Sequence, residues 1–278
     1  MTITNSFTVD LEDWFQGLTS TNKHPDRWGS LEARVEANTD RLLALLAEYD
    51  VRATFFVLGQ VADQYPDMIR RIDAAGHEIG AHGYSHLKVN HLTPERFAEE
   101  VDRALESLTR LTRQSIAGHR APYFSINGQS LWALEVLRDK GFQYDASFFP
   151  TRNMLYGYPD APRFPHKHQA SGLIEFPAST ALWVGRKWPI AGGFYVRSLP
   201  YAIIRAALQQ INRHGQPAIM YVHPWELDTG QRHNKVTPRE RVTHYHGRGS
   251  LERKLRRLFS EFHFAPLHDL MPGLSLQA

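Results

Sequence analysis

Short apolar runs alternate along the chain with longer segments whose apolar residues recur at helical spacing. A continuous apolar or β-branched run predicts a buried strand, because a strand covered on both faces has no polar side. Eight short runs predict strands, of which 53–59 is continuously apolar. The predicted strands are 6–10, 53–59, 77–81, 115–119, 142–145, 172–177, 218–222 and 264–267.

The segments between these runs predict amphipathic helices. The helix over 93–111 has Thr93 as its N-cap and Pro94 as its first residue, which is the usual way for a helix to begin. Leucine and valine repeat every three to four residues within it and form one apolar face. Further helices are predicted at 38–49, in a segment ending near Gly76, and at 129–140, 198–214 and 250–262.

Strands and helices alternate without a clear linker, which predicts one α/β domain built on parallel strands. About seven or eight strands suit a closed or nearly closed (β/α) barrel. We therefore expect residues 1–278 to form a single catalytic domain, with 228–278 as a C-terminal extension packed on the barrel. Two stretches depart from the alternation, namely 151–170, rich in Tyr, Pro and His, and 228–249, which is polar and basic.

Composition narrows the class of protein. The 278 residues are 42% hydrophobic and 22% charged, which is typical of a globular chain. A net charge of only +3 argues against a nucleic-acid binder. Cysteine is absent, so any metal ligands must be His, Asp or Glu. No signal peptide and no membrane-spanning run is recognisable, which predicts the cytoplasm, either free or at the inner face of the membrane.

Two histidines, His82 and His86, lie four residues apart in the stretch GAHGYSH. On one turn of helix this spacing points both rings the same way, as a shared metal ion would require. The spacing alone also fits a surface pair or a core histidine, so the rest of the chain must decide between these readings.

Reactive side chains follow five of the predicted strands. In α/β barrels the chemistry lies at the carboxyl ends of the strands, so these side chains are expected to share one rim. Their common position makes a catalytic rim more plausible than five unrelated polar residues. They are Asp10, His82, Arg120, Asp145 and His223.

The order of these residues resembles the NodB-like polysaccharide deacetylases, carbohydrate esterase family four. The resemblance extends from Asp10 to about Trp225 and depends on five motifs in order. Within this family, the chain is similar to the deacetylases of exopolysaccharide loci with exosortase systems. Its C-terminal segment is similar to that subgroup too. The motifs are TVDLEDWF, GHEIGAHGYSH, HRAPYFSI, YDASFFP and YVHPWELD.

The resemblance implies a distorted barrel and a divalent metal, zinc by preference, bound by His82 and His86. It also implies that Asp10 is the catalytic base. The family usually has two adjacent Asp here, and this chain departs from that pattern, so the carboxylate ligand is either Glu12 or Asp13. Glu12 is preferred, because on an extended strand it shares a face with Asp10.

The same resemblance implies roles for four more residues. Arg120 matches the residue that holds the base carboxylate, and the backbone N–H of Tyr123 matches the donor to the oxyanion. His223 matches the general acid, and Asp145 is expected to orient it.

The implied activity is removal of N-acetyl groups from an amino sugar of an exopolysaccharide or its precursor. The expected partner is an N-acetylated or lipid-linked glycan, while the oligomeric state stays open. Two alternatives remain at this point, an allantoinase-like hydrolase of a small cyclic amide and a non-catalytic sugar-binding domain.

Overall fold

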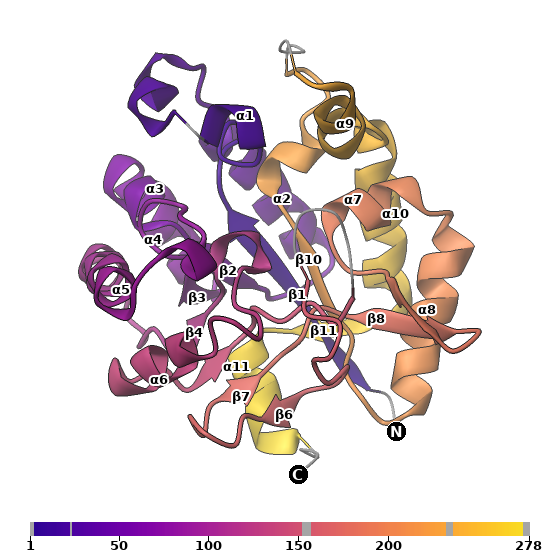
Figure 1. The fold of residues 1–278 in the computed structure, drawn as a ribbon. Coiled ribbons are helices and arrows are strands. Elements are labelled where there is room, and N and C mark those ends of the chain that lie inside the picture. The colour runs from indigo at the N-terminus through magenta and orange to yellow at the C-terminus, as the bar shows by residue number, and fades with distance from the viewer. Residues whose placement is uncertain (1–2, 23, 152–156, 232–235, 275–278) are drawn as a thin grey trace.

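The computed structural model describes residues 3–22, 24–151, 157–231 and 236–274, which fold around one curled β-sheet (Figure 1). The strand order is β10-β1-β2-β3-β4-β5-β7-β6, and β11 pairs with the start of β1. Neighbouring strands are parallel except for β6, which runs antiparallel to β7. The strands are β1 (Thr4–Leu11), β2 (Thr54–Val57), β3 (Glu78–Ala81), β4 (Gly118–His119), β5 (Tyr144–Asp145), β6 (His166–Lys167), β7 (Ile174–Glu175), β10 (Ile219–Val222) and β11 (His263–Ala265).

The chain beyond β7 reaches across to β10, so the curled sheet nearly closes on itself. Ser179 donates its backbone N–H to the carbonyl of Ile219 over 3.1 Å, and its hydroxyl accepts from the Ile219 N–H at 2.8 Å. A separate antiparallel hairpin follows, made of β8 (Thr180–Trp183) and β9 (Arg186–Pro189). The predicted α/β fold with a distorted parallel barrel is confirmed, whereas this hairpin was not predicted.

Helices surround the sheet on its outer side (Figure 1). The longer ones are α2 (Val35–Glu48), α4 (Pro66–Ala74), α5 (Pro94–Thr109), α6 (Trp132–Asp139), α8 (Tyr201–Arg213) and α10 (Arg248–Glu261), and the shorter α3 (Gly59–Gln64) precedes α4. Short ones are α1 (Thr19–Asn22), α7 (Gly193–Ser198), α9 (Pro238–Glu240) and α11 (Leu267–Leu270). Short 3-10 segments lie at Pro25–Ser30, Val89–His91, Pro122–Phe124, Pro224–Leu227 and Met271–Gly273, and Arg241–Tyr245 is π-helical. None of the helices in the described ranges combines the length and apolar character needed to cross a bilayer.

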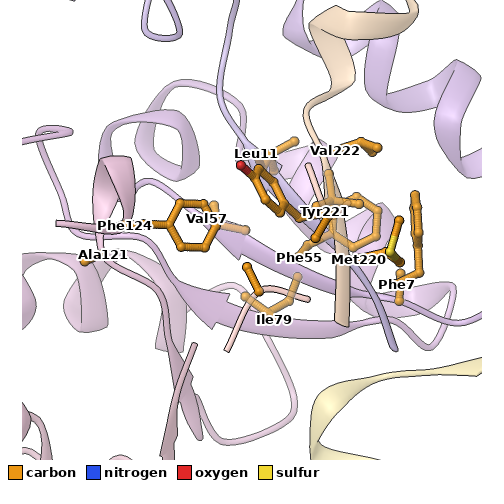
Figure 2. Packing of buried hydrophobic residues seen from close by; sticks show 14 of the residues in the cluster. Phe7, Leu11, Phe55, Val57, Ile79, Ala121, Phe124, Met220, Tyr221 and Val222 are labelled. Atoms are coloured by element: carbon orange, nitrogen blue, oxygen red, sulfur yellow. The ribbon is translucent and has the colours of Figure 1, made fainter. Parts of the chain in front are cut away.

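Alternation along β1 separates the structural core from the site. Phe7, Val9 and Leu11 are buried in the main hydrophobic cluster, in which Figure 2 shows Phe7 and Leu11, and the Phe7 ring meets Phe259 of α10 edge-on with its centroid 5.0 Å away. Successive strand residues face opposite sides of a sheet, so Thr8 and Asp10 project into the barrel instead. One strand therefore contributes both to the main hydrophobic core and to the polar interior.

The C-terminal part closes the end of the barrel where the strands begin. Leu267 of α11 is fully buried inside the barrel with Phe56 and Tyr144, and its N–H donates to Thr54 at the start of β2 over 2.8 Å. In the predicted extension 228–278, residues 232–235 and 275–278 lie outside the described part of the chain. The candidate functional site lies at the opposite end of the barrel, where the strands finish.

Candidate active site

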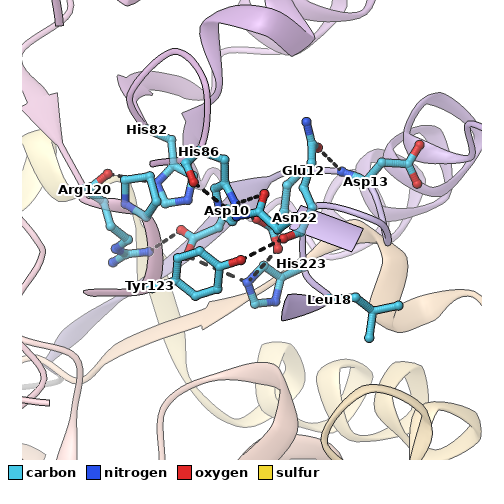
Figure 3. Close-up of polar contacts among 12 residues, drawn as sticks. Asp10, Glu12, Asp13, Leu18, Asn22, His82, His86, Arg120, Tyr123 and His223 are labelled. Carbon is cyan, nitrogen blue, oxygen red and sulfur yellow. Dashed lines mark hydrogen bonds and ion pairs between the residues drawn. The ribbon is translucent and has the colours of Figure 1, made fainter. Parts of the chain in front are cut away.

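A cavity of about 480 Å³ opens at the carboxyl ends of the strands. Predicted site residues from separate strands and loops line it together (Figure 3). These are Asp10, Glu12, His82, His86, Tyr123 and His223. The guanidinium of Arg120 lies directly behind Asp10, fully buried.

Three side chains in this cavity form a potential metal site. One donor atom from each of Glu12, His82 and His86 lies within 4.8 Å of the others, and all three residues are buried. Glu12 Oε2 is 2.7 Å from His86 Nε2. One carboxylate and two imidazoles are a common ligand set for a divalent ion and leave further coordination positions open.

The two histidines do not lie on a turn of helix, so that prediction was wrong. His82 directly follows β3 and His86 belongs to the irregular segment after it, with a φ of +56°. Gly83, with a φ of +74°, begins the turn that brings the chain back. The rings nevertheless end up with centroids 5.5 Å apart, because the loop rather than helical geometry brings them together.

Each imidazole is held by a hydrogen bond through its far nitrogen. His82 Nδ1 is 2.8 Å from the carbonyl oxygen of Arg120, and His86 Nδ1 is 3.2 Å from Oδ1 of Asn22 in α1. Ligating histidines typically donate their second nitrogen in this way, which leaves Nε2 to face the ion. The donor set and its supporting contacts therefore fit a divalent metal. Sequence analysis missed Asn22, and no motif marks it.

The two carboxylates left open by the sequence face different ways (Figure 3). Asp13 accepts from the backbone N–H groups of Arg34 and Val35 at 2.7 and 3.0 Å, and so caps α2. Burial raises the pKa of Asp13 to about 6, although these N–H groups oppose the rise. Burial would also raise the pKa of Glu12, but His86 and neighbouring imidazoles lower it to about 2. The geometry thus brings Glu12, and not Asp13, to the histidines.

Asp10 is fixed by a fully buried arginine. Arg120 Nη1 donates to Asp10 Oδ1 and to Thr8 Oγ1, both at 2.7 Å, and its Nε donates to the carbonyl of Ala146 at 3.0 Å. The remaining oxygen, Asp10 Oδ2, lies 4.0 Å from His223 Nε2. A carboxylate and an imidazole are thus held facing each other inside the cavity.

His223 is paired with Glu226, and the prediction that Asp145 orients it was wrong. His223 Nδ1 is 2.5 Å from Glu226 Oε1, three residues further along in the 3-10 turn. Asp145 lies deeper in the barrel, where its Oδ1 is 2.8 Å from His119 Nδ1 and it also accepts from Ser147. The turn after β10 supplies a nearer carboxylate, and the three-residue spacing in HPWE was the signal that could have revealed it.

Charge around His223 favours its protonated form. Burial alone would lower its pKa, but the carboxylates of Glu12, Glu226 and Asp10 raise it to about 9. His82 shows the opposite balance, because burial lowers its pKa to about 4. Near neutral pH, His223 is therefore cationic and His82 neutral.

Tyr123 and the far wall of the cavity complete the site. Tyr123 has a φ of +58°, which non-glycine residues seldom adopt, and its ring lies 4.7 Å from that of His86. Leu18, Phe194 and Val242 also line the cavity, and sequence analysis identified none of them. Their apolar surfaces give the cavity a wall that the five motifs do not encode.

Comparison with known proteins agrees with this architecture. Residues 26–144 match the polysaccharide deacetylase family, and residues 146–272 match a domain of unknown function, DUF3473. The peptidoglycan-N-acetylglucosamine deacetylase of Bacillus cereus is 35% identical over 98 residues, which cover 35% of this chain and 36% of that enzyme. The alignment thus spans little more than a third of the relative's length.

Solved structures show the same fold. A candidate polysaccharide deacetylase of Mycobacterium smegmatis superposes with a TM-score of 0.67 at 22% identity, covering 99% of this chain and 92% of the other. A family-four pseudoenzyme of Bacillus anthracis superposes with a TM-score of 0.52 at 14% identity, covering 97% and 66%. Residues 26–144 are thus similar to the polysaccharide deacetylases, and the chain as a whole shares the fold of these solved structures.

Proposed function

We propose that this chain is a metal-dependent hydrolase that removes N-acetyl groups from an amino sugar of an exopolysaccharide or its precursor. One observation carries the proposal: Asp10 and His223 face each other across 4.0 Å beside the three-donor cluster. Hydrolysis of an unactivated amide needs a base for water, an acid for the departing amine and stabilisation of the oxyanion. The cavity contains a candidate for each.

Glu12, His82 and His86 are the residues that would hold the ion, and zinc is the ion we propose for this donor set. When bound, the ion supplies Lewis-acid polarisation of the acetyl carbonyl and makes water easier to deprotonate. Hydrogen bonds from the protein fix the two imidazoles: the Arg120 carbonyl contacts His82, and the Asn22 side chain contacts His86.

Asp10 is the proposed base. Its Oδ1 is occupied by Arg120, so Oδ2 is the oxygen that accepts the proton as water attacks. The buried ion pair keeps the carboxylate in one orientation, which positions the proton acceptor before the substrate arrives.

His223 is the proposed acid, and Tyr123 the proposed oxyanion donor. The Nε2 proton of His223 passes to the sugar nitrogen as the C–N bond breaks, because an amine anion is too basic to leave unaided. The backbone N–H of Tyr123 donates to the oxygen that becomes negative, and the unusual φ of this residue directs its backbone.

The size and lining of the cavity support a sugar substrate. Its volume of about 480 Å³ is within the range of roughly 300–1,000 Å³ seen for small-ligand pockets. Aromatic side chains such as Phe194 and Trp225 line it beside the polar groups. The exopolysaccharide assignment depends on the motif resemblance, and a lipid-linked glycan is the proposed form of a precursor.

An acetate-release assay tests this function. The purified chain, loaded separately with zinc, cobalt and manganese, is incubated with N-acetylglucosamine oligomers of one to six units and with other N-acetylated glycans. Acetate release by the wild type and its absence with Asp10→Asn are expected. Asp40→Asn is the matched control, because Asp40 lies on the surface of α2.

Other outcomes would identify the alternatives. Hydrolysis of allantoin without acetate release from any sugar would favour a small cyclic amide as the substrate. Glycan binding by calorimetry, with no release of acetate under any metal, would show a non-catalytic sugar-binding domain.

A further inference from the structure

We propose that Glu226, clamped by Arg197, is the positioning residue for the acid His223, and that this pair is a function of the DUF3473 half of the chain. The inference rests on the proposed function, because it assigns the support of that site's proton donor. It departs from the resemblance, which pointed to Asp145.

Glu226 uses its two oxygens for two different partners. Oε1 lies 2.5 Å from His223 Nδ1, and Oε2 accepts from Arg197 Nε at 2.9 Å. The Arg197 and Glu226 side chains are each only 1% exposed. Two buried charges need such close pairing, since an unpaired one would lose its hydration without compensation. The carboxylate is therefore held from both sides.

This contact decides which nitrogen of His223 faces the reaction. With Nδ1 hydrogen-bonded to Glu226, Nε2 is the atom directed toward Asp10 and Glu12, at 4.0 and 3.5 Å. The ring also stacks on Trp225 with an interplanar angle of 19°, which limits its rotation. A carboxylate on the far nitrogen is the usual means of fixing the tautomer of a catalytic imidazole.

Arg197 connects this pair to the far wall of the cavity. Besides Glu226, its guanidinium donates to the backbone carbonyls of Thr243 and His246. Thr243 itself lines the cavity. The buried guanidinium of Arg197, a residue of α7, thus contacts both Glu226 and the 243–246 segment beside the cavity. All of these residues lie within 146–272.

Gly193 allows the position of the Glu226 carboxylate to be changed without replacing Glu226 itself. A Cβ atom at this position would lie 1.7 Å from Glu226 Oε2, far inside contact distance. The residue has no left-handed φ, so alanine is excluded by the carboxylate and not by the backbone. Gly193→Ala should therefore displace Glu226 while leaving Glu226, Arg197 and His223 in the chain.

Asp145 does not contact His223 Nδ1, because its oxygens are bound to other residues. Its Oδ1 is bound to His119 Nδ1 and to the hydroxyl of Ser147, and its Oδ2 accepts from the Ser147 N–H at 3.1 Å. These contacts lie on β4, β5 and the segment just after β5, whereas His223 follows β10. Glu226 is accordingly the carboxylate on the acid's Nδ1.

The test compares two leaving groups. Release of acetate from an N-acetyl sugar requires a proton on the departing amine, whereas 4-nitrophenyl acetate loses a phenolate that leaves without one. The kcat/KM ratio of amide to aryl ester is therefore expected to fall at least about tenfold in Glu226→Gln, mainly through the kcat of the amide. Metal content by elemental analysis is expected to stay that of the wild type.

Gly193→Ala is expected to lower the same ratio, while Gly249→Ala, an exposed helix position with no atom within 4 Å of the added Cβ, is expected to leave it unchanged. Proton NMR gives a readout without turnover: the downfield resonance of the His223 Nδ1 proton is expected in the wild type and lost in Glu226→Gln.

Two results would overturn the inference. An equal loss on both substrates would show that Glu226 acts only on the structure, and a retained downfield resonance would show that it does not bind Nδ1. A wild type that releases acetate from no N-acetyl sugar contradicts the proposed function instead, and so the two failures are distinguishable.

Discussion

His86 Nε2 lies 2.7 Å from Oε2 of Glu12, and both side chains are almost completely buried. They come from two separate segments, since Glu12 directly follows β1 and His86 lies in the loop after β3. A buried carboxylate loses its hydration and needs close partners, and the neighbouring His82 brings a third potential metal-binding side chain to the pair.

The first prediction concerns metal content. The wild type is expected to contain about one divalent ion per chain, and His82→Ala with His86→Ala is expected to contain none, as measured by elemental analysis. The matched control replaces two exposed histidines, His91 and His263, with alanine. Equal metal in all three proteins would contradict the site.

The second prediction separates Glu12 from Asp13. Glu12→Ala is expected to weaken metal binding at least tenfold in a titration, because it removes a ligand. Asp13→Ala is expected to keep the affinity but to lower the free energy of unfolding by about 0.5–2 kcal/mol, the usual cost of losing a helix cap. The reverse pattern would make Asp13 the ligand.

The third prediction concerns Asp10. Asp10→Asn is expected to reduce kcat for deacetylation by about a hundredfold to ten-thousandfold while the ion stays bound, since the base is lost but no ligand is. Stopped assays of acetate and elemental analysis on the same sample measure both properties. Joint loss of activity and metal would assign Asp10 to the ion instead.

The fourth prediction is a pH dependence of stability from His77, a buried histidine outside the site. Its unprotonated Nδ1 accepts from the Ala53 N–H at 3.2 Å, and burial, with nearby Arg52, lowers its pKa to about 4. The unfolded chain, with a pKa near 6.5, takes up the proton first as pH falls. This stabilisation is complete above about pH 6.5 and is lost toward pH 4, about 2 kcal/mol of it by pH 5.

Urea unfolding at pH 7 and pH 5 checks this prediction. His77→Asn, whose side-chain oxygen can still accept the bond, is expected to lose less stability between the two pH values than the wild type does. His263→Asn, at an exposed position, serves as the control. The same pH dependence in all three proteins would contradict the role of His77.

Local sequence was sufficient for the fold class and for most strands and helices. Thr93 accepts from the Arg96 N–H at 3.3 Å, as the predicted N-cap of the 93–111 helix requires. The observed α5 spans Pro94–Thr109, which differs only at its ends. The β8–β9 hairpin was missed, because its residues are half exposed and do not form a continuous apolar run.

Sequence by itself also determined which strand ends carry reactive side chains, because apolar periodicity locates the strands and the polar residues come directly after them. Only the tertiary structure decided how these side chains pair. The loop from Gly83 to His86 replaces the expected helical turn, the cap of α2 draws Asp13 away from Glu12, and Glu226 takes the place expected of Asp145. Such pairings depend on which groups lie close together in the folded chain. Spacing along the chain offers Glu226 as one candidate partner for His223, but it does not show that Asp145 is bound to His119 instead.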